Sequence, residues 1–206
     1  DYLADISDYE VVEALNEDAQ PITDKDGSVR GFPFAMEGFG ILYNEEIFDR
    51  YFALPNPAVA SMDEINNFGA LKAVAEDMQG KKEELGIDGA FAVTSLIAGE
   101  EWRWTNHLMN GPYHYEILDR DINEFQDMPT IDFTYGDNFK QLFDLYLQNS
   151  TTKPALAASR ATSDSMAEFA TGKAAMVQNG NWAWSQIAGD ASNVVKEDTV
   201  SYTHLR

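Results

Sequence analysis

Residues 172–187 read GKAAMVQNGNWAWSQI. The stretch opens with a glycine typical of a helix end, continues as an apolar strand, and turns at 179–181 before two tryptophans. Trp182 is therefore expected beside a turn, where its ring can face a cleft. An indole ring offers a flat apolar surface and one N–H donor, which suits a sugar ring. Taken alone, these sixteen residues favour the alternative, in which Trp182 and Trp184 simply pack into a core.

The composition is that of a globular protein with one large domain or slightly more. The chain has 206 residues, of which 44% are hydrophobic, enough for a packed core. Its 35 acidic and 14 basic residues give a net charge of -21, which repels nucleic acids and anionic lipids. We expect a monomer that acts outside the cytoplasm, binds neutral ligands and has no nucleic-acid partner.

Several chemistries are absent from the sequence. Without cysteine, the chain has no disulfide, thiolate metal site or cysteine nucleophile. His107, His114 and His204 show no metal-ligand spacing, and no phosphate-binding loop or nucleophile elbow occurs. The sequence thus indicates no metal and no cofactor, and His107 is interpreted as a residue on a helix surface.

The two ends of the sequence suggest a piece of a longer precursor. The first residue is not methionine, and the start lacks the basic and apolar regions of a signal peptide. We therefore expect a targeting signal upstream. The last six residues, 201–206, read SYTHLR and differ in character from the acidic stretch before them. They are interpreted as a non-native tail.

The hydrophobic pattern predicts a mixed α/β fold. A strand-like run at 30–44 is followed by a helix that Asn44 can cap. Ser61 and Glu64 form a capping box that predicts a second helix through Met78, and a strand is expected at 90–96. The order β-α-α-β is typical of an α/β domain.

Further along, the pattern predicts a short helix over 102–109 that ends at Gly111-Pro112, followed by an irregular region over 113–136. Apolar residues at helical spacing over 139–147 predict a strong helix. A linker at 150–163 then leads to a short helix with Ser163 as its expected cap.

Three segments, in this order, resemble a known family: FPFAMEGFGILYNEEIF at 32–48, PNPAVASMDEI at 55–65 and FATGKAAMVQNGNWAWSQI at 169–187. The chain resembles the extracellular solute-binding proteins of bacterial ABC sugar importers, the maltose-binding-protein-like family. The resemblance spans about residues 30–190. It implies a type II periplasmic-binding-protein-like α/β fold with two lobes. Residues 1–36 would be the end of the first lobe with a hinge strand, and 37–200 most of the second lobe.

The resemblance also implies ligand-binding residues. Glu37 matches a cleft carboxylate that follows the hinge strand, although a lone acid in a loop is more often just solvated. Trp182 matches the tryptophan on which sugars stack. Asn181 departs from the pattern, since the maltose-binding example has proline at that place.

A second group implied by the resemblance is an acid with an aromatic ring at the start of a cleft-lining helix. Trp102 is the aromatic residue, and either Glu100 or Glu101 is the acid. Acids also favour the first turn of any helix, so a surface cap followed by a core ring is an equal alternative.

The resemblance implies a receptor that captures a carbohydrate between its lobes by hinge closure and delivers it intact to the permease of an ABC transporter. It would lie in the periplasm or be anchored by lipid at the outer face of the membrane, and would not be an enzyme. Two alternatives remain open. A glycoside hydrolase would pair Glu37 with Glu100 or Glu101, although no eightfold barrel repeat occurs. A protein-interaction module would display Trp182 on a convex face.

Overall fold

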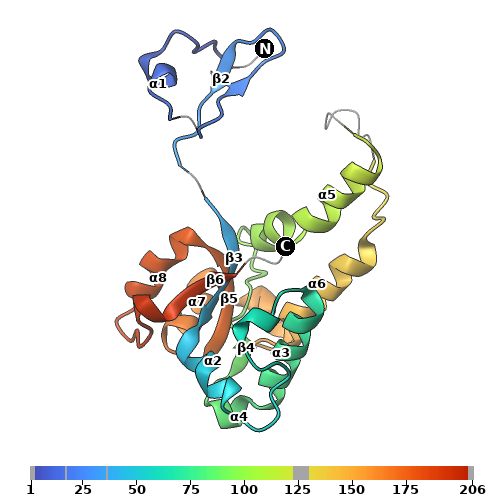
Figure 1. Ribbon diagram of the computed structural model, residues 1–206, viewed down its shortest axis with the longest axis vertical. Coiled ribbons are helices and arrows are strands. Elements are labelled where there is room, and N and C mark those ends of the chain that lie inside the picture. Colours follow the sequence, from blue (N-terminus) through green and yellow to red (C-terminus); the bar gives the residue numbers. More distant parts are fainter. Residues whose placement is uncertain (1–2, 17, 36, 123–129, 204–206) are drawn as a thin grey trace. The chain divides into compact units, whose positions relative to one another are not determined.

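The computed structural model describes residues 3–16, 18–35, 37–122 and 130–203. They form two compact units, Asp1–Gly38 and Phe39–Arg206 (Figure 1). Each unit is described by itself.

The first unit holds a short helix and a hairpin. Helix α1 spans Glu10–Glu13, and strands β1 (Ile22–Thr23) and β2 (Val29–Gly31) pair antiparallel. Gly27 lies in the turn between them with φ 85°, a conformation that glycine adopts without steric cost. Among the described residues of this unit, Val29 is the one buried hydrophobic residue. With so little buried apolar surface, the unit has only a minimal core.

The second unit is built on a four-stranded sheet in the order β4-β5-β3-β6. β5 pairs antiparallel with β3 and parallel with β4, and β6 pairs antiparallel with β3. All residues of β5 are buried, as expected for a strand covered on both faces. The strands are β3 (Phe39–Asn44), β4 (Gly89–Phe91), β5 (Ala174–Gly180) and β6 (Val200–Thr203).

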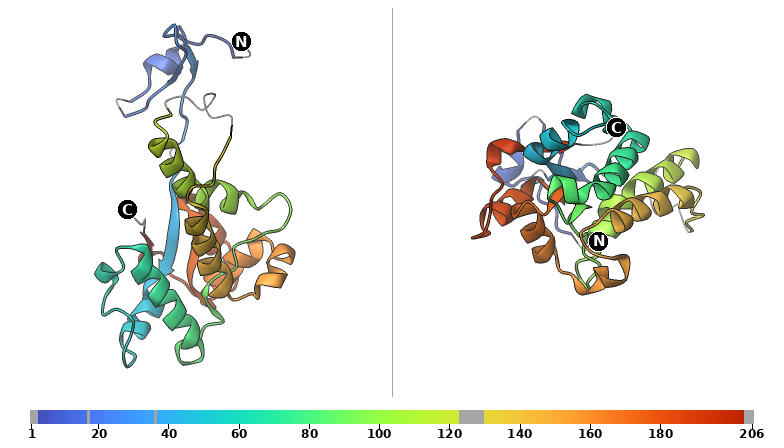
Figure 2. Two further views of the ribbon diagram at one scale, coloured as in Figure 1. Left: turned by 90° about the vertical axis from the view of Figure 1, so that its right-hand side faces the viewer. Right: turned by 90° about the horizontal axis from the view of Figure 1, so that it is seen from below.

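Helices flank this sheet (Figures 1 and 2). They are α2 (Glu45–Phe52), α3 (Phe68–Gly80), α4 (Lys82–Leu85), α5 (Asn110–Asp119), α6 (Gly136–Gln148), α7 (Thr162–Ala170) and α8 (Trp184–Ala188). Shorter helical turns lie at Met62–Glu64, Arg103–Leu108, Pro154–Ser159, Asn181–Ala183 and Glu197–Thr199. Arg103–Leu108 is a π-helical turn that leads into α5. The predicted mixed α/β class is confirmed.

Two hydrophobic clusters hold this unit together. The larger one joins β3 and β4 to α2, α3 and α6, with Tyr51, Trp104 and Phe91 among its largest buried side chains. The second joins the other side of the sheet to α7 and α8 through Phe169 and Ile187. Trp184 packs against this second cluster, as predicted. The sheet is therefore fixed from both faces, and the ends of β3 and β5 are positioned rigidly.

Several local predictions are confirmed. The Asn44 side chain accepts a hydrogen bond from the backbone N–H of Ile47 and caps α2. The strong helix predicted at 139–147 is α6, and the predicted strand before Trp182 is β5. The strand-like run at 30–44 contains β2 and β3, which belong to different units.

The predicted start of the second helix is wrong. Ser61 makes no capping hydrogen bond, and only a short turn follows it. The carboxylate of Glu64 instead accepts from the backbone N–H of Ala60. α3 begins at Phe68, where the Asn67 side chain accepts from the N–H of Ala70. Asn caps a helix as well as Ser does. Asn67 stands directly before the helically spaced apolar residues of α3, so the helix starts there.

The predicted helix end at Gly111-Pro112 is also wrong. Both residues lie in the first turn of α5, which continues to Asp119. Proline is tolerated there because the first-turn N–H groups need no partner within the helix. Part of the region expected to be irregular is therefore helical.

Two smaller predictions concern helix α7 and the tail. The residue before α7 is Ala161 rather than Ser163, and the Asp164 carboxylate accepts a hydrogen bond from its N–H. Residues 200–203 form β6 and pair with β3, whereas 204–206, the rest of the expected tail, lie outside the described residues. Among the described residues, no helix is long and apolar enough to cross a membrane.

Candidate functional site

Trp182 is placed by the end of β5. The strand ends at Gly180, and a helical turn at Asn181–Ala183 leads into α8. The indole ring lies against Gly180, because a Cβ atom added to that glycine would be 2.2 Å from the ring. The backbone of Gly180 is extended, with φ -127°, so the need for glycine here is steric. The ring is half-buried.

Four rings from three parts of the chain meet near this point. The ring centroid of Trp182 lies 6.3 Å from that of Trp102 and 5.8 Å from that of His107. Trp102 and His107 are 4.9 Å apart, edge to face. The His107 ring stacks on Phe39 at 4.0 Å with an interplanar angle of 5°. We call Phe39, Trp102, His107 and Trp182 the ring cluster.

Sheet register brings the ring cluster together. Phe39 is the first residue of β3 and pairs with Gly180, the last residue of β5. Phe39 and Trp182 therefore lie at the same end of these two strands. The π-helical turn that follows Trp102 carries His107. The cluster thus joins segments that are far apart in the sequence.

Arg103 supports the ring cluster from within the protein. Its guanidinium lies over the Trp102 ring, 4.1 Å from the centroid. Nη1 donates to the Thr162 hydroxyl at 2.9 Å, and Nη2 to the Asn179 side-chain oxygen at 3.4 Å. Only 5% of Arg103 is exposed, so the cation–π contact is shielded from water, where such contacts are strongest. The Trp102 ring is held in one orientation as a result.

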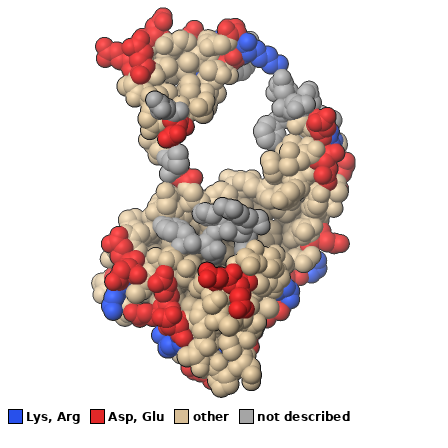
Figure 3. Space-filling model, in the orientation of Figure 1, with Lys and Arg blue, Asp and Glu red and all other residues tan. Residues whose placement is uncertain are grey.

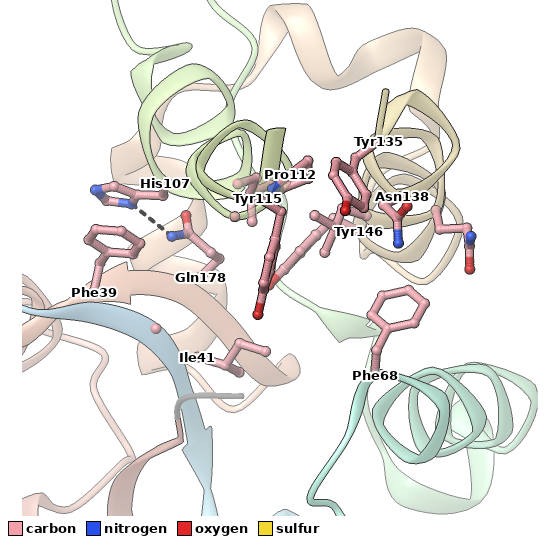
Figure 4. Close-up of a pocket in the computed structure, with 15 residues that line it drawn as sticks. Phe39, Ile41, Phe68, His107, Pro112, Tyr115, Tyr135, Asn138, Tyr146 and Gln178 are labelled. Atoms are coloured by element: carbon pink, nitrogen blue, oxygen red, sulfur yellow. Dashed lines mark hydrogen bonds between the residues drawn. The ribbon is translucent and has the colours of Figure 1, made fainter. Parts of the chain in front are cut away.

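His107 is tied to the sheet by Gln178. The Gln178 side-chain nitrogen lies 2.7 Å from Nδ1 of His107 (Figure 4). Burial lowers the pKa of His107 from its usual 6.5; the hydrogen bond to Gln178 raises it, and the Arg103 charge lowers it further. The imidazole is therefore neutral at pH 7. His107 is half-buried and packed among rings, so its interpretation as a helix-surface residue is wrong.

A cavity of about 640 Å³ lies beside the ring cluster, and Phe39 and His107 belong to both (Figure 4). This volume is within the usual range for small-ligand sites. Its lining carries no charged residue, whereas the protein as a whole is strongly acidic. The lining residues are Phe39, Gly40, Ile41, Phe68, His107, Leu108, Gly111, Pro112, Tyr115, Tyr135, Asn138, Gln141, Leu142, Tyr146 and Gln178. Trp102 and Trp182 are not among them.

The predicted acids lie in different surroundings. Glu37 is exposed and belongs to the first unit. Glu100 is half-buried, and its carboxylate accepts from the backbone N–H of Thr162 at the start of α7. That hydrogen bond is the largest of the effects that lower the pKa of Glu100. Glu101 is exposed. The structure thus brings Trp182 and Trp102 together, and it places Glu100 at a helix start.

The sequence analysis missed Phe39, His107, Gln178 and Arg103. Gln178 could have been noticed in the sequence, because it is a polar residue that directly follows the apolar run of the buried strand β5. The other three depend on pairing between distant segments, which no local pattern reveals. Among the described residues, no group of three His, Asp or Glu side chains is arranged to hold a metal ion.

The charged part of the surface is mainly acidic, as the composition indicates. On the face shown in Figure 3, groups of acidic side chains lie on the second unit, with a few basic side chains among them.

Several solved structures share this fold. A chitin oligosaccharide binding protein is 22% identical with a TM-score of 0.67, over 98% of this chain and 47% of that chain. The bacterial solute receptor AcbH, whose description gives an exclusive preference for β-D-galactopyranose, is 18% identical with a TM-score of 0.61, over 98% and 46%. An ABC transporter solute-binding protein from Agrobacterium radiobacter K84 in complex with ribitol is 18% identical with a TM-score of 0.60, over 98% and 47%.

These likenesses show the fold, the α/β fold of type II periplasmic binding proteins, as the resemblance implied. The chain spans about half the length of the structures it matches. A comparison with curated protein sequences gives no match. The family model described as bacterial extracellular solute-binding protein matches residues 1–204, and the chain therefore belongs to the bacterial extracellular solute-binding proteins.

Proposed function

We propose that this protein is the carbohydrate-binding component of an ABC importer and that its ring cluster is a platform for a sugar. The single observation that carries the proposal is the contact among the rings of Trp102, His107 and Trp182 near the end of β5. Aromatic faces suit the apolar C–H faces of a pyranose, and half-buried indoles keep an N–H for its hydroxyl groups. Similar structures described with chitin oligosaccharide, galactopyranose and ribitol support a neutral polyhydroxylated ligand.

Acidic residues are proposed to bind the hydroxyl groups of the sugar. A carboxylate can accept two hydroxyl hydrogen bonds at once, each charge-assisted. Glu101 is exposed and follows directly after Glu100, whose carboxylate is bound at the start of α7. We therefore propose Glu101 as the acid that contacts the sugar beside the platform, and Glu100 as the residue that fixes the backbone near Thr162. Glu37, which matches a cleft carboxylate of the family, is proposed as a further sugar-binding acid.

The domain assignment extends this proposal. Residues 1–36 would be the end of one lobe with its hinge strand, and 37–200 would be most of the second lobe. Sugar would be captured between the lobes and would stabilise the closed form through contacts that the open form lacks. The family acts outside the cell, so we place capture in the periplasm or at the outer face of the membrane. The permease of the transporter is the proposed partner of a monomeric receptor.

A receptor of this kind releases its sugar intact. A glycoside hydrolase needs a carboxylic acid with a raised pKa to protonate the leaving group. The pKa of Glu100 is lowered instead, chiefly by the hydrogen bond from Thr162. This speaks against Glu100 as the general acid of the hydrolase alternative.

The experiment compares Trp182→Ala and Trp102→Ala with the unaltered full-length protein, by calorimetric titration against neutral mono- and oligosaccharides. We expect each variant to lose about two- to tenfold in affinity, since stacking on an aromatic ring is worth about 0.5–1.5 kcal/mol. Trp184→Phe, which alters an indole outside the ring cluster, serves as the control. Unchanged affinity in both alanine variants would show that the ring cluster is not the sugar platform. The appearance of shorter sugars would favour the hydrolase.

A further inference from the structure

His107 is the member of the ring cluster whose ring carries two nitrogen atoms, one of which can accept a hydrogen bond while the other donates one. Its ring is clamped on one face by Phe39, at 4.0 Å and nearly parallel, and Trp102 meets it edge to face. Trp182 lies 5.8 Å away. A polar group so placed lies within reach of any ligand that stacks on the two tryptophans.

Gln178 decides which imidazole nitrogen carries the proton. Its side chain is 3% exposed, its nitrogen faces Nδ1 of His107 at 2.7 Å, and its buried oxygen has no hydrogen-bond partner. An amide nitrogen only donates, so Nδ1 accepts and the proton of the neutral ring is on Nε2. Figure 4 shows the second ring nitrogen of His107 directed away from Gln178 and the cavity.

From this geometry we propose that His107 is a ligand-binding residue whose Nε2–H donates a hydrogen bond to a sugar hydroxyl, and that Gln178 is the positioning residue that fixes its tautomer. The inference rests on the proposed function. It deepens that function by adding an imidazole donor to the indole N–H groups and the acids already proposed. A hydroxyl held between a carboxylate acceptor and an imidazole donor satisfies both of its hydrogen-bonding roles. The ligand this favours is a neutral sugar with a free hydroxyl at the edge of the stacked ring.

The first test needs no sugar. Nitrogen-15 NMR of the imidazole in the full-length protein at pH 7.5 reports the tautomer directly. We expect His107 in the Nε2–H form with Nδ1 as an acceptor. An Nδ1–H form would mean that the Gln178 amide is oriented the other way, which would overturn the proposal.

The second test measures binding. His107→Phe keeps a flat ring on Phe39 and removes the donor, and we expect sugar affinity to fall about three- to tenfold, the effect of one lost hydrogen bond. Gln178→Leu is expected to weaken binding in the same direction and to release the tautomer preference in the NMR spectrum. His114→Phe, at an exposed histidine on α5, is the matched control and should bind as the unaltered protein does.

The outcomes separate this inference from the proposed function. If Trp182→Ala abolishes binding and His107→Phe leaves it unchanged, the platform stands and the role of His107 is wrong. If sugar binds and neither variant affects it, the platform itself is misplaced, and the proposal for His107 falls with it.

Discussion

Trp182 occupies its position because residue 180 has no side chain. The ring fills the space that a Cβ of Gly180 would occupy, and strand pairing sets Gly180 opposite Phe39. Around this contact, the stacked guanidinium of Arg103 orients Trp102, and the hydrogen bond of Gln178 orients His107. The orientations of Trp102 and His107 are thus fixed by buried residues that would not themselves contact a sugar.

Gly180→Ala should displace the Trp182 ring, because the added methyl group and the ring cannot share the same space. We expect about a tenfold loss of sugar affinity and a shifted indole N–H signal of Trp182, measured by calorimetry and NMR. Gly80→Ala, where an added Cβ meets nothing within 4 Å, is the matched control. Full affinity in Gly180→Ala would show that the ring position does not matter for binding.

His107 makes the folded protein sensitive to acid. Its pKa is lowered in the folded state, chiefly by burial, so the unfolded chain binds a proton more readily. Stability is therefore complete above the usual histidine pKa of about 6.5 and falls as pH drops below it. We expect urea denaturation to show a smaller loss of stability between pH 7.5 and 5 in His107→Phe than in the unaltered protein. Equal losses would mean that the histidine titrates normally.

At the scale of single residues, the sequence allows Trp182 and Trp102 to be predicted as neighbours of a site, because the family pattern carries them. It does not allow His107 to be predicted, because its partner Gln178 is 71 residues away and Phe39 comes from a third segment. Stacking between distant rings depends on strand register, which sequence periodicity does not determine.

Elements with a clear period were predictable from the sequence. α6 and β5 follow from their apolar spacing, and α2 from its Asn cap. α5 was not predictable, because Gly111-Pro112 normally ends a helix and here lies in a first turn. The start of α3 was misplaced because two good capping residues, Ser61 and Asn67, compete within one turn region.

Glu168 on α7 binds three segments of the chain that lie between the helices and strands. Its carboxylate accepts from the Val93 backbone N–H at 3.0 Å and from the Thr151 hydroxyl at 2.6 Å, and pairs with Arg160 at 2.6 Å. Only 9% of Glu168 is exposed. Glu168→Ala leaves these donors without a partner, and we expect a loss of about 2–4 kcal/mol in the free energy of unfolding.

Urea denaturation measures that loss. Glu76→Ala, which breaks an exposed ion pair with Lys72 on α3, should change stability by less than about 1 kcal/mol. If both variants lose the same small amount of stability, the three segments are held to α7 by packing alone.

At the scale of the molecule, both hydrophobic clusters lie in residues 39–206. The described residues of the first unit bury one hydrophobic side chain, Val29. We expect a protein of residues 39–206 to unfold cooperatively within a few degrees of the melting temperature of residues 1–206. Residues 1–38 alone should show no cooperative transition in circular dichroism. A large drop in melting temperature on removing 1–38 would show that the second unit depends on it.

The central claim is that this protein binds a neutral carbohydrate and leaves it intact. The most direct test equilibrates the full-length protein with a mixture of neutral oligosaccharides, isolates the protein and identifies the released ligand by mass spectrometry. We expect one class of saccharide to be enriched on the protein at its original length. The same saccharide should be absent when Trp182→Ala is treated in the same way. No enrichment, or recovery of shortened sugars, would contradict it.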